Sequence, residues 1–273
     1  MGIEIKDYDL RTFNLLTTLA TFLNENDDGD INVILAKYFL NNIEKIQSKS
    51  IYDIADECYT SRSTVQRFIK YIGFDTFSNL QTKLKESYAH NYRFENFYKQ
   101  DDFRNKYLKD FNEMTESVNR ICDSKTIDYF VDLIHISSTV VFNYAESSTI
   151  APLDFQEAML RAHKTIRIIT NSSRNTNLLN NLTENDTLIT TSVTGNFAIA
   201  TLEEISQIRA NKILITLNRN ERLKEVYDKV IYLSDDVSTD DFNQKGIRNA
   251  YTIYSLSYML DLMLNKYFEK YVR

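Results

Sequence analysis

The segment from Ser61 to Lys70 combines residue types that suit contact with nucleic acid. Arginine can grip guanine edges or phosphates, glutamine can pair with adenine, and hydroxyl groups suit phosphate. No acidic residue lies between Ser61 and Ile72. The residues expected at base edges are Arg62, Ser63, Gln66 and Arg67, and those expected at phosphates or in helix capping are Ser61, Thr64 and Lys70. The alternative is a helical packing module with a solvated basic face.

Two short helical patterns would position these side chains. Apolar residues recur at i, i+3, i+4 and i+7 in each pattern, which is the spacing that lines one face of an α-helix. The first set is Ile51, Ile54, Ala55 and Cys58, and the second is Val65, Phe68, Ile69 and Ile72. Ser61 is a natural N-cap for the second helix, and Gly73 suits a left-handed C-cap. This layout predicts a helix-turn-helix whose second helix lies in a DNA major groove.

Further helical patterns flank this motif and predict an all-α N-terminal region. Helices are expected over residues 10–23, 31–46 and 78–92, with a loop from Asn24 to Asp30. The stretch from Tyr92 to Lys106 is rich in aromatic and charged residues, and we expect a linker that is at least partly helical. Two more helices are expected over 104–122 and 124–136.

The pattern then changes to short β-branched runs that alternate with helices. The expected strands are Thr139–Asn143, Thr165–Ile169, Thr187–Thr191, Lys212–Thr216 and Lys229–Leu233. The expected helices between and after them cover 150–162, 175–182, 196–210, 220–227 and 245–272. Strands separated by helical crossovers predict a five-stranded parallel sheet with helices on both faces.

Two loops at the carboxyl ends of these strands carry hydroxyl groups and free backbone N–H groups, which phosphate binding requires. The first follows the first strand and the second follows the third strand. The candidate ligand-binding residues are Asn143, Ser147, Ser148, Ser192, Thr194, Gly195 and Asn196. The alternative is plain helix N-capping, because Ser, Thr and Asn are preferred helix starters.

Composition and charge are those of a soluble protein with a local basic region. The 273 residues carry a net charge of −6, whereas residues 33–90 carry eight Lys or Arg against six Asp or Glu. A small basic region on an acidic protein suits a site-specific DNA reader. The two cysteines and three histidines show no ligand spacing, so neither a metal nor a cofactor is expected. Without an apolar leader or spanning segment, the protein is expected in the cytoplasm, away from membranes.

The motif resembles the N-terminal domain of the RpiR/MurR-type bacterial transcription regulators. The family pattern is matched at Ile51, Ala55, Ser61, Thr64, Val65, Arg67, Phe68, Gly73, Phe74 and Phe77. One departure is Tyr59, where the family usually has glycine in the turn. If that position needs a positive φ, a bulky residue there costs on the order of 1 kcal/mol.

The second half resembles, more weakly, the SIS (sugar isomerase) domain that is joined to this motif in the same family. The family's first loop reads Gly-x-Gly-x-Ser, whereas this chain has Asn143 and Ala145 at the glycine positions. Its second loop reads Ser-x-Ser-Gly-x-Thr, whereas Phe197 replaces the final threonine here. The resemblance implies a dimerising domain that binds a phosphosugar through these loops. The lost glycines leave a remodelled ligand or a purely dimerising domain as alternatives.

Together these patterns predict a sequence-specific transcription regulator with three parts. A helix-turn-helix DNA-binding domain is expected at 1–90, a helical linker at 91–123, and an SIS-like α/β sensor and oligomerisation domain at 124–273. The expected partners are a double-stranded DNA operator, a second copy in a homodimer or higher homo-oligomer, and a phosphosugar effector. The main alternative is a ligand-blind regulator. A sugar-phosphate isomerase is the less favoured alternative, because no catalytic pairing is readable and an enzyme needs no DNA-binding motif.

Overall fold

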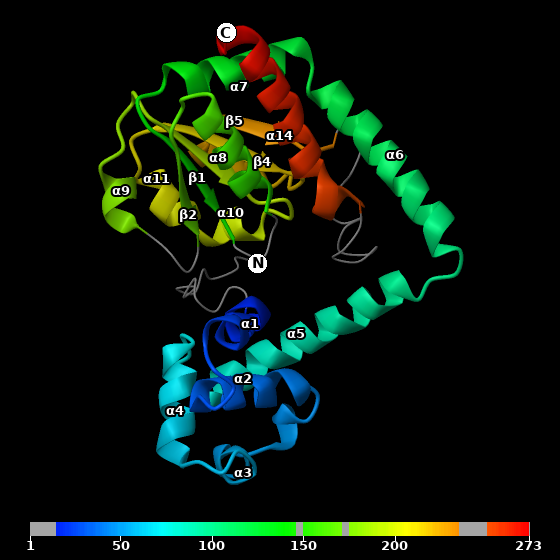
Figure 1. Cartoon of the computed structure of the whole chain (residues 1–273), viewed down its shortest axis with the longest axis vertical. Helices are drawn as coiled ribbons and strands as arrows, with labels where there is room; N and C mark the ends of the chain where they lie inside the picture. The colour runs from blue at the N-terminus through cyan, green and yellow to red at the C-terminus, as the bar shows by residue number, and fades with distance from the viewer. Residues whose placement is uncertain (1–14, 146–149, 171–174, 235–249, 273) are drawn as a thin grey trace. The chain divides into compact units, whose positions relative to one another are not determined.

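The chain divides into two compact units, Met1–Asn96 and Phe97–Arg273 (Figure 1). The computed structural model describes residues 15–145, 150–170, 175–234 and 250–272, without the side chains of 86–94. None of the helices in these ranges is both long enough and apolar enough to cross a membrane.

The described residues of the first unit contain helices and no strand, as the sequence predicts. Its helices are α1 (Leu15–Glu25), α2 (Ile31–Asn41), α3 (Ile51–Glu57), α4 (Arg62–Tyr71) and the first part of α5 (Phe77–Tyr98), with a short 3₁₀ turn at Ile46–Ser48. Residues 10–14 of the first predicted helix lie outside the described residues. The apolar faces of all these helices meet in one core. At its centre the rings of Phe39 and Phe68 stack with centroids 6.0 Å apart, and the ring of Phe22 meets Phe68 edge-on.

The predicted end of α2 is wrong by five residues, because the helix stops at Asn41 rather than Ile46. At the helix end the carbonyl of Tyr38 accepts both the side-chain amide of Asn42 at 2.9 Å and its backbone N–H at 3.1 Å. Ile43 and Ile46 remain buried in the turns that follow. The apolar pattern therefore continues beyond the helix, which explains the error.

The second unit contains a five-stranded, fully parallel sheet with strand order β2-β1-β3-β4-β5. The strands are β1 (Val140–Tyr144), β2 (Ile166–Thr170), β3 (Thr187–Thr191), β4 (Asn211–Thr216) and β5 (Lys229–Tyr232). Each strand end lies within one residue of its predicted position. The predicted fold class, an all-α motif followed by an α/β domain with a parallel sheet, is therefore confirmed.

Helices cover both faces of this sheet. They are α6 (Phe103–Ile121), α7 (Ser124–Ile136), α8 (Ala151–Arg161), α9 (Thr176–Asn180), α10 (Asn196–Ala200), α11 (Leu202–Ser206), α12 (Glu221–Val226) and α14 (Ala250–Tyr271). One core lies between the sheet and α6, α7, α8 and α14, and includes Phe142, Phe155 and Met259. The other core lies between the opposite face and α9, α11 and α12, and includes Val141 and Leu214. The neighbouring residues Val141 and Phe142 of β1 thus point into opposite cores. This alternation is expected of a strand that is buried on both faces of its sheet.

The helix predicted over 196–210 is wrong in detail, because two short helices that end at Ser206 are observed in its place. The helix expected over 196–210 is divided at Thr201 into α10 and α11. The carbonyl of Phe197 accepts both the hydroxyl of Thr201 at 2.9 Å and its backbone N–H at 3.0 Å. The closing helix is observed from Ala250, and its predicted start at Lys245 lies outside the described residues.

The segment between the two units is largely helical. Helix α5 continues to Tyr98, and α6 begins at Phe103 after a turn in which Asp102 has a φ of 56°. Helix α6 packs along α14 within the second unit. The ring of Phe97 contacts the ring of Phe103 with centroids 5.3 Å apart, which anchors the end of α5. The division into domains at 1–90, 91–123 and 124–273 stays a prediction.

Candidate nucleic-acid interface

Helix α3 begins with a complete capping box. The hydroxyl of Ser50 accepts from the Asp53 backbone N–H at 3.2 Å, and the Asp53 carboxylate accepts from the Ser50 N–H at 2.7 Å. Both bonds satisfy donors that the helix start leaves unpaired. They also hold the pKa of Asp53 below its ordinary value, chiefly through the backbone N–H of Ser50. The first helix of the motif is therefore fixed at its start.

The turn after α3 requires a left-handed residue, and that residue is Tyr59. Its φ is 51°, and the N–H groups of Tyr59 and Thr60 donate back to the carbonyls of Asp56 and Ala55 at 3.1 and 2.8 Å. This pair of bonds is the Schellman arrangement, in which glycine normally occupies the position of Tyr59. The tyrosine side chain is 98% exposed. The motif therefore keeps the turn that a glycine favours, at a cost in backbone strain.

Helix α4 is capped at both ends by the predicted residues. The hydroxyl of Ser61 accepts from the Thr64 N–H at 3.1 Å, which makes Ser61 the N-cap. At the other end Gly73 has a φ of 96°. The N–H groups of Gly73 and Phe74 donate to the carbonyls of Lys70 and Ile69 at 3.1 and 3.0 Å. A second Schellman arrangement therefore ends the helix, and both predicted caps are confirmed.

The face of α4 that points away from the core is polar and basic. Arg62, Ser63, Arg67 and Lys70 are exposed, and Thr64 and Gln66 are half-buried. The guanidinium of Arg67 donates to the Thr64 hydroxyl at 3.3 Å. The side-chain amide of Gln66 donates to the carbonyl of Asp75 at 3.3 Å. The predicted DNA-contacting residues thus share one helix and one side of it, and their contacts with DNA stay predictions.

Arg62 at the start of α4 has a partner on α3 that sequence reasoning missed. Its guanidinium carbon lies 5.2 Å from the ring centroid of Tyr52, and Tyr52 is itself exposed. An arginine over an aromatic face gains electrostatic attraction and loses side-chain freedom. The ring of Tyr52 therefore orients Arg62 before any ligand arrives.

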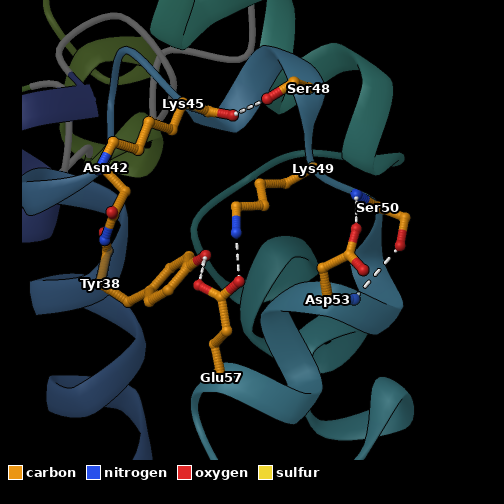
Figure 2. A network of polar contacts seen from close by, with 8 residues as sticks. All are labelled: Tyr38, Asn42, Lys45, Ser48, Lys49, Ser50, Asp53 and Glu57. Carbon is orange, nitrogen blue, oxygen red and sulfur yellow. Dashed lines mark hydrogen bonds and ion pairs between the residues drawn. The ribbon is translucent and has the colours of Figure 1, made fainter.

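A second group of polar contacts joins α2 to α3 (Figure 2). The Tyr38 hydroxyl donates to one Glu57 carboxylate oxygen at 2.7 Å, and Lys49 forms an ion pair with the other oxygen. The bonds from Lys49 and Tyr38 hold the pKa of Glu57 below its ordinary value. Burial and the Glu57 carboxylate raise the pKa of Tyr38. Because Lys49 lies in the loop before α3, this carboxylate ties three segments of the motif together.

The candidate ligand loops of the α/β unit are engaged in internal contacts. Asn143 is completely buried, and its amide lies 3.4 Å from the Thr190 hydroxyl on the neighbouring strand. The Ser192 hydroxyl accepts from the Ala198 N–H at 3.2 Å. Ser147 and Ser148 lie outside the described residues. For Ser192 this geometry is the one expected of a residue that fixes the start of α10.

The glycine in the second loop is required by its surroundings. Gly195 has a φ of 81°, and a Cβ atom at this residue would lie 2.3 Å from the side chain of Asn218. The Asn218 amide in turn donates to the Thr194 carbonyl at 3.0 Å. Phe197, which replaces the threonine of the family pattern, is buried. The side chains of Thr194 and Asn196 are exposed, so these two remain accessible to a ligand.

Cysteine, histidine and carboxylate side chains of the described residues are not grouped as a metal site would require. No cluster of three or more such residues occurs in the part of the chain that the structure describes. Both cysteines are buried and free.

Residues 15–91 match the family model of the helix-turn-helix domain, rpiR family. No curated protein sequence matches the chain significantly. Similar solved structures include the Vibrio vulnificus NanR protein complexed with ManNAc-6P, at 15% identity and a TM-score of 0.49, over 94% of this chain and 93% of that chain.

Two further solved structures are similar to part of the chain. The sugar isomerase domain of the RpiR transcription factor from Sphaerobacter thermophilus has 14% identity and a TM-score of 0.42, over 60% of this chain and 90% of that chain. The c3406 protein of E. coli CFT073 has 14% identity and a TM-score of 0.43, over 64% of this chain and 95% of that chain.

Proposed function

Because residues 15–91 form a helix-turn-helix domain of the rpiR family, we propose that the protein is a sequence-specific DNA-binding transcription regulator. The observation that carries the proposal is the outer face of α4, where Arg62, Arg67 and Lys70 are all exposed on a helix capped at both ends. Such a helix can enter a major groove without rearrangement, and its basic side chains favour the phosphate-rich surface of DNA.

We propose separate roles for the residues of this face. Arg62, Ser63, Gln66 and Arg67 read base edges, and Ser61, Thr64 and Lys70 contact phosphates or maintain the cap. The bond from Gln66 to the Asp75 carbonyl is exposed. When the Gln66 amide binds a base edge, it therefore exchanges its hydrogen bond to the Asp75 carbonyl for a hydrogen bond to the base.

The regulator acts as a homodimer in this proposal, in the cytoplasm and without a membrane partner. One recognition helix reads only a few base pairs, so specific affinity generally requires two half-sites. When two chains associate through their α/β units, the helix-turn-helix of the second chain can read the second half-site.

We further propose that the α/β unit receives a phosphosugar signal. The accessible side chains of Thr194 and Asn196 lie beyond the carboxyl end of β3, where ligands of such sheets bind. The alternative is a ligand-blind α/β unit that only oligomerises, and the internal bonds of Asn143 and Ser192 favour it. An isomerase is the weaker alternative, because a catalyst has no use for the exposed basic face of α4.

The test compares variants of the full chain on fluorescently labelled DNA from its own promoter region. Arg67→Ala removes a side chain proposed to read a base, and a bidentate contact of this kind is worth about 1–3 kcal/mol, or roughly 5- to 150-fold in affinity. Lys37→Ala, at an exposed position of α2, removes the same unit charge and serves as the matched control. We expect a large loss of sequence discrimination for Arg67→Ala and only a small, sequence-independent loss for Lys37→Ala.

Equal effects of the two substitutions would contradict the assigned role of α4. Circular dichroism of both variants shows whether each one folds. Titration of the wild-type complex with a panel of sugar phosphates then separates the two α/β proposals. A shift in DNA affinity with one compound supports a sensor, and the absence of any shift supports the ligand-blind alternative.

A further inference from the structure

The outward face of α8 carries an apolar stripe. Ile150, at its N-cap, is 69% exposed, and Leu153 and Leu160 are 48% and 53% exposed. The opposite side of the helix, with Phe155 and Met159, is buried in the core that α8 shares with the sheet and α14. The stripe is therefore a second apolar face, on a helix whose first apolar face is already used.

The spacing of this stripe follows a heptad. Ile150, Leu153, Glu157 and Leu160 stand at i, i+3, i+7 and i+10, the a and d positions of a helix that packs along another helix. In an antiparallel pair of such helices, Ile150 meets the partner's Leu160 and Leu153 meets the partner's Glu157. Each contact is then made twice about a twofold axis, so the stripe is complementary to itself.

The charges beside the stripe are also self-complementary. Asp154 and Arg161 occupy the two e positions of this heptad pattern. Side chains tilt toward the N-terminus of their own helix, so Asp154 and the partner's Arg161 lean toward each other in an antiparallel pair. Asp154 is exposed and has no ion-pair partner among the described residues. A second copy of α8 would supply that partner.

The polar residue within the stripe fits the same arrangement. The guanidinium of Arg161 donates to the Glu157 carboxylate at 2.7 Å, so the charge of Glu157 is balanced within its own helix. Arginine has five N–H donors and can hold a second carboxylate as well. A polar residue in an a position lowers the stability of a helix pair.

We propose that α8 is a dimerisation helix that pairs antiparallel with α8 of a second copy of this chain. This inference rests on the proposal that the regulator acts as a homodimer. An 11-residue helix is about 16 Å long, and a pair of that length gives an interface at the small end of the range for specific complexes. The fraction of dimer should therefore depend on the protein concentration in the absence of DNA.

Sedimentation velocity of the full chain over a wide concentration range tests the apolar stripe. The double variant Leu153→Asp/Leu160→Asp places charge in the seam and should raise the dissociation constant at least about tenfold. Leu108→Asp changes a leucine on α6 that is 58% exposed, and it should leave the dimer intact. The same dimerisation in the double variant as in the wild type would overturn the proposal, and so would equal dissociation by Leu108→Asp.

A charge-reversal experiment tests the antiparallel register itself. In the dimer of the Asp154→Arg variant, the arginine at 154 of each copy faces Arg161 of the other copy. In the dimer of the Arg161→Asp variant, Asp154 of each copy faces the aspartate at 161 of the other copy. Each variant alone should dimerise more weakly than the wild type. A mixture of the two variants restores both opposite-charge pairs in the heterodimer, and should associate more tightly than either variant alone. A mixture that associates no better than its components would overturn the pairing.

The outcomes separate this inference from the proposal beneath it. A wild-type chain that stays monomeric at every concentration would overturn both the homodimer and the role of α8. The same conclusion would hold if the stripe of such a monomeric chain bound a different protein. A wild-type dimer that all stripe variants preserve would overturn only the role of α8. Failure of DNA binding appears in the anisotropy experiment and leaves the sedimentation result unchanged.

Discussion

Tyr59→Gly should stabilise the helix-turn-helix, although it removes a large side chain. Tyr59 holds a left-handed conformation with a φ of 51°, which costs a residue with a Cβ atom roughly 1–2 kcal/mol. Its side chain is 98% exposed, so its removal forfeits little burial. Glycine loses more conformational freedom on folding, a penalty of about 0.5–1 kcal/mol. The net gain is about 1 kcal/mol.

Differential scanning calorimetry and native-state hydrogen exchange of the full chain measure this gain. A gain of about 1 kcal/mol raises the midpoint of a domain of this size by roughly 4–8 °C. It also slows exchange of the most protected amides of α3 and α4 about fivefold. The turn hydrogen bonds made by the N–H groups of residue 59 and Thr60 should persist, because they depend only on the backbone.

Tyr59→Ala is the matched control for this prediction. It removes the same ring but keeps the Cβ atom and therefore the strain, so its stability should stay close to that of the wild type. A Tyr59→Gly variant no more stable than Tyr59→Ala would refute the reasoning, because the cost of the turn would then not arise from the left-handed backbone.

Two further predictions follow from the polar contacts. In the second unit, burial raises the pKa of Asp186, but hydrogen bonds from Thr183 and Thr139 outweigh burial and hold that pKa below its ordinary value. The stability that Asp186 contributes is therefore present above about pH 4, and it is lost as the pH falls through the lowered pKa of Asp186 in the folded protein. Asp186→Asn should flatten this part of a plot of unfolding free energy against pH. In the first unit, Tyr52→Leu should lower discrimination between specific and scrambled DNA several-fold, because Arg62 loses the aromatic ring that orients it. Tyr52→Phe should preserve discrimination, because it retains the aromatic face. Equal losses in both variants would assign the effect to the tyrosine hydroxyl instead.

Local rules were sufficient to predict much of the fold from the sequence. The apolar spacing and caps of α4 depend on residues within one turn of each other, so Ser61 and Gly73 were found correctly. The strands were located because a buried parallel strand is a short, continuous β-branched run. The end of α2 was missed because Ile43 is buried in a turn and extends the helical pattern.

The contacts that shape the candidate sites could not be predicted in the same way. Tyr38 and Glu57 lie 19 residues apart, and Gly195 and Asn218 approach each other only through the pairing of β3 with β4. Such partners depend on tertiary packing and leave no periodic signal. The sequence predicts α8 as a helix but does not separate its exposed apolar residues from its buried ones. The heptad spacing of the exposed stripe is recognised only when the buried face is known.

The central claim is that the outer face of α4 reads a specific DNA sequence. Its most direct test is fluorescence anisotropy of the full chain with DNA from its own promoter region and with scrambled DNA of the same composition, at increasing salt. The claim predicts tighter binding to the promoter DNA, with an affinity for both DNAs that falls as salt rises because phosphate contacts release counterions. Weak binding that is equal on both DNAs at every salt concentration would contradict it, and α4 would then be a packing helix with a solvated basic face.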